Sequence, residues 1–406
     1  MKNGFALVLM ILFLTGCASL PVSASPPEIQ TYALIATKQP LISPTPTPML
    51  TATPVVRFTR RCLPIDDREV KLSDVASGTV LVIWHERDSP TVDDSRRIFY
   101  DIQTGNEYQL SSPSSKESLF ISEEASPNRK LFARLEITFT GNKPIRAVLW
   151  VLDAQANIIA RKEFNRADLV SLSWLDNEHL LIETGKYGTL LLVNLFTGEQ
   201  HLLADKLPDL YPYKPYYDTY SPWFPVVYSP DLEWVIYFSQ RIESDSYHSG
   251  AVLYDLATKQ TIWKQDYGIS PFWSPDGKVF AFVPAGTEQQ LYLFSRSRQL
   301  KAVLDQSLPH EVDELSWSPD GNLIAFRNAG RLMIYDRQKD WVFDTCILVN
   351  QIFDESWSPD SRQIIVIPTD DSAPMLLVDW QAKIAYKNIK DLPRDTVPDA
   401  WINSMP

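Results

Sequence analysis

The sequence predicts an all-β protein built from repeated small sheets, and three observations lead to this expectation. The 406-residue chain is 45% hydrophobic and 22% charged, which is a globular composition with ample material for a core. Its 30 prolines outnumber its 14 glycines, which indicates short strands and tight turns rather than a Gly-rich nucleotide-binding fold. One motif also returns every 40 to 54 residues. A period of this size, with several short strands in each unit, is typical of a β-propeller.

The first 16 residues are predicted to be a lipoprotein signal peptide. Lys2 precedes an apolar run over residues 5–14, which is too short to cross a bilayer because a membrane-spanning helix needs about 20 residues. The ending LTGC at 14–17 resembles the bacterial lipobox, in which the chain is cut before a cysteine that receives a diacylglyceryl group. The resemblance implies that Cys17 is acylated, with palmitate among its chains, and anchors the protein to a membrane. An ordinary secretory signal is the alternative.

Residues 17–61 are predicted to be a lipidated N-terminus followed by a disordered Pro/Thr-rich linker. The stretch from Ala18 to Arg61 has no glycine, and its prolines alternate with threonines. Such a segment prefers extended polyproline II structure and cannot bury a core. We therefore expect a stalk that carries a propeller domain over residues 62–406.

The repeat itself has two halves. Four clear copies of the first half are VVYSPDLEWVIYF (226–238), FWSPDGKVFAFV (272–283), LSWSPDGNLIAFR (315–327) and ESWSPDSRQIIVI (355–367), and two degenerate copies cover 123–135 and 172–183. The equivalent aromatic position is occupied in turn by Ala125, Trp174, Tyr228, Trp273, Trp317 and Trp357. Seven second halves, each an alternating run, a turn and another run, lie at 98–110, 147–160, 189–203, 251–263, 290–304, 331–343 and 375–389.

One first half is missing, and the C-terminus supplies a candidate for it. Trp401 lies 44 residues after Trp357, where a seventh copy is due, and residues 79–84 (TVLVIW) form a strand without a partner. We expect seven blades, closed by pairing of the C-terminal strand with residues 79–84. Such closure leaves no exposed central edge strand.

The repeated residues fit tight turns and blade packing. In Ser-Pro-Asp-Gly, proline suits the second position of a β-turn, and aspartate and glycine suit the third and fourth. The recurring tryptophan is interpreted as a wedge between neighbouring blades, because its repetition favours a scaffold role. A platform on which a ligand stacks is the alternative.

The repeat resembles that of the TolB-like propellers, also described as WD40-like, whose mark is W-S-P-D-G followed by a β-rich run. Residues 273–277 and 317–321 match fully, whereas residues 357–360 are followed by serine instead of glycine. The resemblance implies a propeller fold and leaves the function open, because such propellers serve as interaction platforms, envelope components and enzyme appendages. TolB itself has a further N-terminal α/β domain where this chain has a stalk, so membership of the Tol-Pal system is not implied.

Several enzyme classes lack their signatures. The chain contains no G-x-S-x-G nucleophile elbow, and the sialidase pattern S-x-D-x-G-x-T-W is absent. The five histidines lie without metal-binding spacing at His85, His179, His201, His248 and His310. Acidic pairs at 66–67, 93–94 and 370–371 are expected to be solvated turns, with a calcium site as the alternative. We expect no catalytic residue, metal or cofactor.

Two cysteines remain after acylation of Cys17, namely Cys62 and Cys346. An exported protein meets oxidising conditions, so these two could form a disulfide between the end of the stalk and the sixth blade. Two unpaired thiols are the alternative.

The most unusual local segment is YPYKPYYDTYSPWF at 211–224. Stiff aromatic rings with polar tips suit recognition of a sugar face or a peptide. The candidate binding residues are Tyr211, Tyr213, Tyr216, Tyr217, Tyr220 and Trp223. The alternative is that these rings cover a blade interface. A second loop at 243–250 is a candidate for the same face, and a solvated hairpin tip is the alternative.

Two functions of different classes follow from these observations. The favoured one is a lipid-anchored protein of the bacterial cell envelope, facing the extracytoplasmic side, whose propeller binds a protein, peptide or glycan without catalysis. The alternative is a propeller hydrolase or lyase with an axial carboxylate or calcium site. A formal charge of −12 disfavours nucleic acid as a partner, and we expect a monomer.

Overall fold

The computed structural model describes most of the chain from residue 56 to residue 402. The parts not described in this range are 85–95, 110–117, 141–142, 185–188, 205–206, 209–225, 241–248, 266–268, 285–289, 305–310, 354–355, 370–374 and 391–395. The described residues form 29 strands and one short helix, α1 (Leu72–Val75). None of these elements is a helix long and apolar enough to span a membrane.

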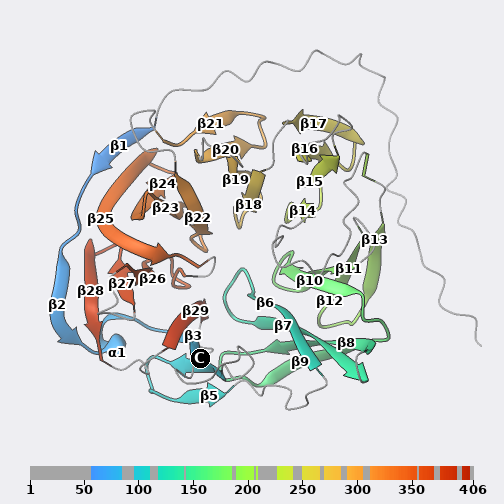
Figure 1. Cartoon of the computed structure of the whole chain (residues 1–406), viewed down its shortest axis with the longest axis horizontal. Helices are drawn as coiled ribbons and strands as arrows, with labels where there is room; N and C mark the ends of the chain where they lie inside the picture. The colour runs from blue at the N-terminus through green and yellow to red at the C-terminus, as the bar shows by residue number, and fades with distance from the viewer. Residues whose placement is uncertain are drawn as a thin grey trace, which may run out of the picture. The chain divides into compact units, whose positions relative to one another are not determined.

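Four sheets each consist of four consecutive antiparallel strands. Their strands are β6 (Ser118–Ala125), β7 (Phe132–Thr140), β8 (Lys143–Leu152) and β9 (Ile158–Phe164); β10 (Leu169–Trp174), β11 (His179–Thr184), β12 (Thr189–Asn194) and β13 (Gln200–Ala204); β14 (Val226–Tyr228), β15 (Trp234–Gln240), β16 (Ser249–Asp255) and β17 (Gln260–Lys264); and β18 (Ile269–Trp273), β19 (Val279–Pro284), β20 (Tyr292–Ser295) and β21 (Leu300–Ala302). In Figure 1 the first strand of each of these sheets lies nearest a common centre.

The C-terminal strand pairs with strands from the N-terminal part of the chain. This sheet has the order β29 (Thr396–Ile402), β3 (Thr79–Trp84), β4 (Arg96–Asp101) and β5 (Glu107–Gln109), all antiparallel. Trp401 pairs with Val80 in the register of β29 and β3. The predicted pairing of the chain's end with residues 79–84 is therefore present.

The remaining strands form one nine-stranded sheet. It contains β22 (Val312–Trp317), β23 (Leu323–Asn328), β24 (Arg331–Asp336), β25 (Trp341–Gln351), β26 (Gln363–Pro368), β27 (Leu376–Asp379), β28 (Ile384–Ile389), β2 (Ile65–Val70) and β1 (Arg57–Arg60). The two parts of this sheet are joined through a short pairing between β25 and β26 at Val349 and Gln351.

Residues 57–70 run along the outer edge of this sheet. β1 pairs in parallel with β25, and β2 pairs in parallel with β28. The sequence predicted linker up to residue 61, but β1 already belongs to a sheet at Arg57. The segment is fixed there by a disulfide between Cys62 and Cys346, whose Cα atoms are 4.8 Å apart. We call residues 57–70 the edge segment.

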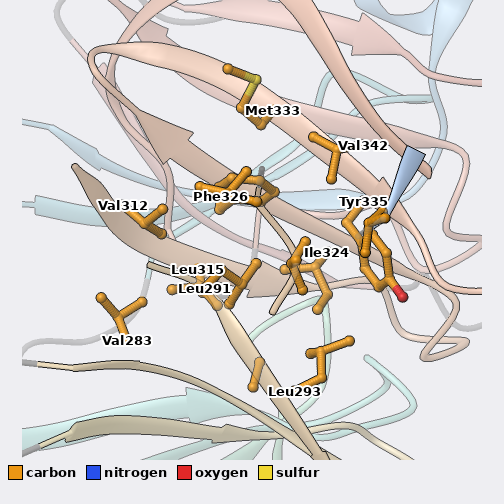
Figure 2. Packing of buried hydrophobic residues seen from close by; sticks show 14 of the residues in the cluster. Val283, Leu291, Leu293, Val312, Leu315, Ile324, Phe326, Met333, Tyr335 and Val342 are labelled. Carbon is orange, nitrogen blue, oxygen red and sulfur yellow. The ribbon is translucent and has the colours of Figure 1, made fainter. Parts of the chain in front are cut away.

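Buried hydrophobic side chains fill the spaces between consecutive sheets. One cluster, drawn in Figure 2, joins β19 and β20 to β22–β25 and includes Leu293, Ile324, Phe326 and Tyr335. Five further clusters occupy the other junctions between neighbouring sheets, and one lies between the two parts of the nine-stranded sheet. The core of the protein is thus a series of layers between sheets.

The repeated Ser-Pro-Asp turn follows β14, β18 and β22, and a further copy precedes β26. In the copy at 274–277, the Ser274 hydroxyl donates to Asp276 at 2.6 Å, and the N–H of Gly277 donates to the carbonyl of Ser274 at 2.8 Å. Gly277 has a φ of 63°, a left-handed conformation that glycine adopts without steric cost. The equivalent copies place Gly321, Ser361, Leu232 and Arg129 in the same conformation. The fourth position of this predicted turn therefore needs a positive φ whether or not glycine is present.

A second recurring turn connects the third and fourth strands of each sheet. In one copy the side chain of Asn194 accepts the N–H groups of Phe196 and Thr197, and Gly198 has a φ of 70°. In another, Asp255 accepts the N–H of Thr258, and the exposed Lys259 has a φ of 57°.

Replacing Lys259 by glycine is expected to raise the free energy of unfolding by about 1 kcal/mol, because a left-handed conformation costs a side chain roughly 1–2 kcal/mol. Urea unfolding of the purified chain measures this gain. Gly198→Ala is the converse change: its new Cβ would meet only Lys162 Nζ at 3.6 Å, so its expected loss of about 1 kcal/mol comes from the backbone. A loss of stability in Lys259→Gly would contradict the argument.

Candidate functional site

A cavity of about 650 Å³ lies where the first strands of five sheets come together. Its lining comes from β6, β10, β14, β18 and β22, with further residues from β11 and from the Ser-Pro-Asp turns. Figure 1 shows these strands near the common centre of the sheets. The volume falls within the range of sites that enclose a small ligand or a few side chains.

One side of the cavity, which we call the acidic wall, carries Glu123 and Glu124 from β6 and Glu183 from β11. Glu124 accepts the backbone N–H of Trp174 at 2.9 Å. Glu183 accepts the hydroxyl of Ser171 at 3.0 Å, and the two residues face each other in the register of β10 and β11. Burial raises the pKa of Glu183 above its ordinary value, although the Ser171 hydrogen bond opposes this rise.

Positive charge also lies near the acidic wall. Arg129, at the left-handed position of its turn, is buried and lines the cavity. Arg134 on β7 lies opposite Glu123 in the strand register, and its Nε is 2.8 Å from Glu136. Trp150 donates its indole N–H to the other oxygen of Glu136 at 3.1 Å. Burial raises the pKa of Glu136 and lowers that of Arg134, because both charged groups are shielded from water.

The other side, which we call the apolar wall, comes from β14, β18 and β22. It contains Val227, Tyr228, Phe272 and Leu315, together with Phe353 from the segment after β25. In Figure 1, β18 and β22 lie across the centre from β6 and β10. The cavity thus has one charged side and one hydrophobic side.

The recurring tryptophans connect neighbouring sheets beside the cavity. The indole N–H of Trp317 donates to the carbonyl of Phe272 at 3.1 Å, and that of Trp357 donates to Ser316 at 3.1 Å. Trp174 makes the same bond to Glu124 at 2.8 Å. The bonds of Trp317 and Trp174 cross from one sheet to the first strand of the preceding sheet, and the bond of Trp357 crosses between the two parts of the nine-stranded sheet. The position of these indoles agrees with the predicted role as wedges.

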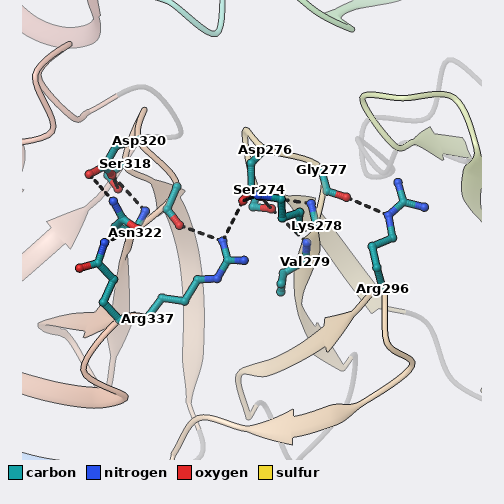
Figure 3. Close-up of polar contacts among 12 residues, drawn as sticks. Ser274, Asp276, Gly277, Lys278, Val279, Arg296, Ser318, Asp320, Asn322 and Arg337 are labelled. Atoms are coloured by element: carbon teal, nitrogen blue, oxygen red, sulfur yellow. Dashed lines mark hydrogen bonds and ion pairs between the residues drawn. The ribbon is translucent and has the colours of Figure 1, made fainter.

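Two arginines also connect neighbouring sheets, at the turns. Arg296 binds both carboxylate oxygens of Asp231 in the preceding sheet at 2.6 Å, and its Nε donates to the Gly277 carbonyl at 2.9 Å. Arg337 repeats this arrangement with Asp276 and Gly321, at 3.4 and 3.2 Å (Figure 3). The aspartate of the Ser-Pro-Asp turn therefore orders its own turn and also binds the next sheet.

Most residues that the sequence singled out for a site are not among those described. Cys17 precedes residue 56, and the aromatic segment Tyr211, Tyr213, Tyr216, Tyr217, Tyr220 and Trp223 falls within 209–225. Of the histidines, His179 pairs with Asp176 and His201 with Glu199. Within the described ranges, no group of three or more His, Cys, Asp or Glu side chains could hold a metal ion.

The glutamates of the acidic wall were not recognised from the sequence. Glu123 and Glu124 directly precede Ala125, the repeat position at which tryptophan usually stands, so their place on a first strand could have been read from the alignment of repeats. That first half is one of the two degenerate copies, and the signal was correspondingly weak. Glu183 lies in the other degenerate copy.

Glu183→Gln is expected to raise the melting temperature at neutral pH. Glu183 has a higher pKa in the folded state than in the unfolded chain, so the folded state binds its proton more tightly. The free energy of unfolding therefore falls as the pH rises from about the ordinary pKa of 4.5 through the raised one. The gain should therefore shrink as the pH falls below 4.5. Calorimetric scans at both pH values test this, and the exposed Glu178→Gln on the same sheet should change neither.

Comparison with known proteins identifies the fold only. No protein-family model matches the chain, and no curated protein matches it. Among solved structures, 994 chains match. One of them comes from a structural and mechanistic analysis of two prolyl endopeptidases, with a TM-score of 0.50 and 14% identity. The match covers 82% of this chain and 48% of that one, so this chain spans about half the length of the peptidase. The likeness supports the predicted all-β, propeller-like fold class.

Proposed function

We propose that this chain is a lipid-anchored protein of the bacterial cell envelope whose propeller is a non-catalytic binding platform for a protein, peptide or glycan. The observation that carries the proposal is the cavity of about 650 Å³ with one acidic and one apolar wall. A hydrophobic surface with a few well-placed polar groups is the usual character of a ligand site. The aromatic segment 211–224 is followed in sequence by Val226 and Val227, which line this cavity.

The platform would be a closed ring of seven blades, of the TolB-like type. In this arrangement β22–β25 and β26–β28 are separate blades, and β29 completes the blade of β3–β5. Seven buried clusters support this count, because each joins one blade to the next. The seventh junction packs Trp401 and Val80 against Leu377, which joins the last blade to the first.

The anchor is proposed from the lipobox at Cys17. Expression of the full chain in a bacterium fed labelled palmitate should give a labelled, membrane-bound protein. Cys17→Ser should lose the label and leave the membrane fraction. Label that persists in this variant would contradict anchoring through Cys17.

The binding role is tested with the melting temperature of the full chain in detergent, measured against a panel of cell-wall peptides and glycans. A ligand that binds only the folded state raises the melting temperature. Phe272→Ala, in the apolar wall, should abolish the rise. The same substitution at the exposed Phe196 is the control. A panel without any effect would contradict the platform.

The second candidate is a propeller hydrolase or lyase with an axial carboxylate or calcium site. The three glutamates of the acidic wall are the carboxylates available to it, but within the described ranges they form no group that could hold a metal ion. Chelator-treated chain scanned with calcium distinguishes the two. A calcium-dependent rise in melting temperature that Glu183→Gln removes would favour the enzyme, whereas a calcium-independent response to a peptide or glycan would favour the platform.

A further inference from the structure

We propose that the cavity selects a cationic peptide segment, with a lysine or arginine head group at the acidic wall and apolar side chains on the apolar wall. This inference rests on the proposed binding function and specifies its ligand class. Two independent features of the cavity point to this class, namely its charge and the division of its lining into two chemically different walls.

The charge of the lining is negative. Among the charged side chains that line the cavity, three are glutamates and one is the guanidinium of Arg129. The whole chain carries a formal charge of −12, which attracts cations from solution. An anionic ligand would therefore meet repulsion both at a distance and on entry.

Glu183 is the carboxylate best placed to receive a cation. Its side chain is partly buried, and its hydrogen bond comes from the neutral hydroxyl of Ser171. Within the part of the chain that the structure describes, it makes no ion pair with lysine, arginine or histidine. A neutral ligand would desolvate this carboxylate further without compensation, whereas an ammonium or guanidinium group would supply a charged donor.

The apolar wall completes the match to a basic peptide. Lysine and arginine have long aliphatic stems that lie along hydrophobic surfaces while the charged head reaches a polar group. Phe272 and Tyr228 add aromatic surface to the lining of the same cavity. A peptide that alternates basic and apolar residues would therefore contact both walls.

The test is isothermal titration of the full chain with the capped peptide Phe-Lys-Leu-Lys and with the same peptide acetylated on both lysine side chains. We expect the free-lysine peptide to bind at least ten times more tightly than the acetylated one. Glu183→Gln should weaken binding of the free-lysine peptide at least fivefold and leave the acetylated one unchanged. Glu178→Gln, the same charge change at an exposed site on the same sheet, should have no effect.

Equal affinity for the two peptides in the unmodified protein would overturn the inference, and this comparison does not depend on whether any variant folds. An equal loss for both peptides in Glu183→Gln would also overturn it, because it would indicate a structural role. If the acetylated peptide or a neutral glycan binds at least as well, the cation inference fails while the binding platform stands. If no peptide or glycan binds, the proposed function fails as well.

Discussion

Replacing Trp357 by alanine is expected to lower the free energy of unfolding by about 3–5 kcal/mol, the range found when a large buried aromatic is truncated. The side chain is fully buried between β23–β25 and β26–β28. Its removal leaves a void in this cluster and takes away the N–H donor of the Ser316 carbonyl. Urea unfolding monitored by circular dichroism measures the loss.

Two further variants separate the causes of this loss. Trp357→Phe keeps most of the packing and removes the hydrogen bond, so its cost should be a minor part of the whole. Trp174→Ala acts at the same repeat position but on a half-buried ring, so it should cost less. A larger loss at Trp174 than at Trp357 would contradict the account of burial.

Removing the disulfide is expected to have an effect of similar size. The free energy of unfolding of the double variant Cys62→Ala/Cys346→Ala should be lower by about 3–5 kcal/mol, because the disulfide closes a long loop in the unfolded chain. The two cysteines are 284 residues apart in sequence. The bond also holds β1 and β2 on β25 and β28, so its loss should expose the edges of both strands.

Unfolding of the unmodified chain with and without a reductant provides the matched comparison. The reduced chain should fall to the stability of the double variant, and the double variant should not respond to the reductant. Equal denaturation midpoints for the oxidised chain and the double variant would contradict a stabilising role for this disulfide.

Repetition explains which parts of the fold were predictable. The Ser-Pro-Asp turns and Trp317 occur in several copies, so each copy supports the interpretation of the others. The edge segment occurs once, and its strands pair in parallel with partners more than 280 residues away. No local sequence pattern predicts such a long-range pairing. The prolines before this segment favoured the interpretation of residues 17–61 as a linker.

The candidate site was less predictable than the fold for a related reason. A cavity depends on where the first strands of several sheets converge, and this convergence is not visible within one repeat. Glu124 and Glu183 stand in the two degenerate copies, where divergence from the repeat hides their position. In both copies the departure from the repeat places an acidic side chain in the lining of the cavity.

The edge segment also determines how a pulling force would enter the protein. Tension applied from the N-terminal side first meets β1, whose parallel pairing with β25 is loaded in shear along its length. The force then passes through the covalent bond from Cys62 to Cys346 into the nine-stranded sheet. The disulfide therefore gives the load a covalent path into this sheet that does not depend on the hydrogen bonds of β1 or β2.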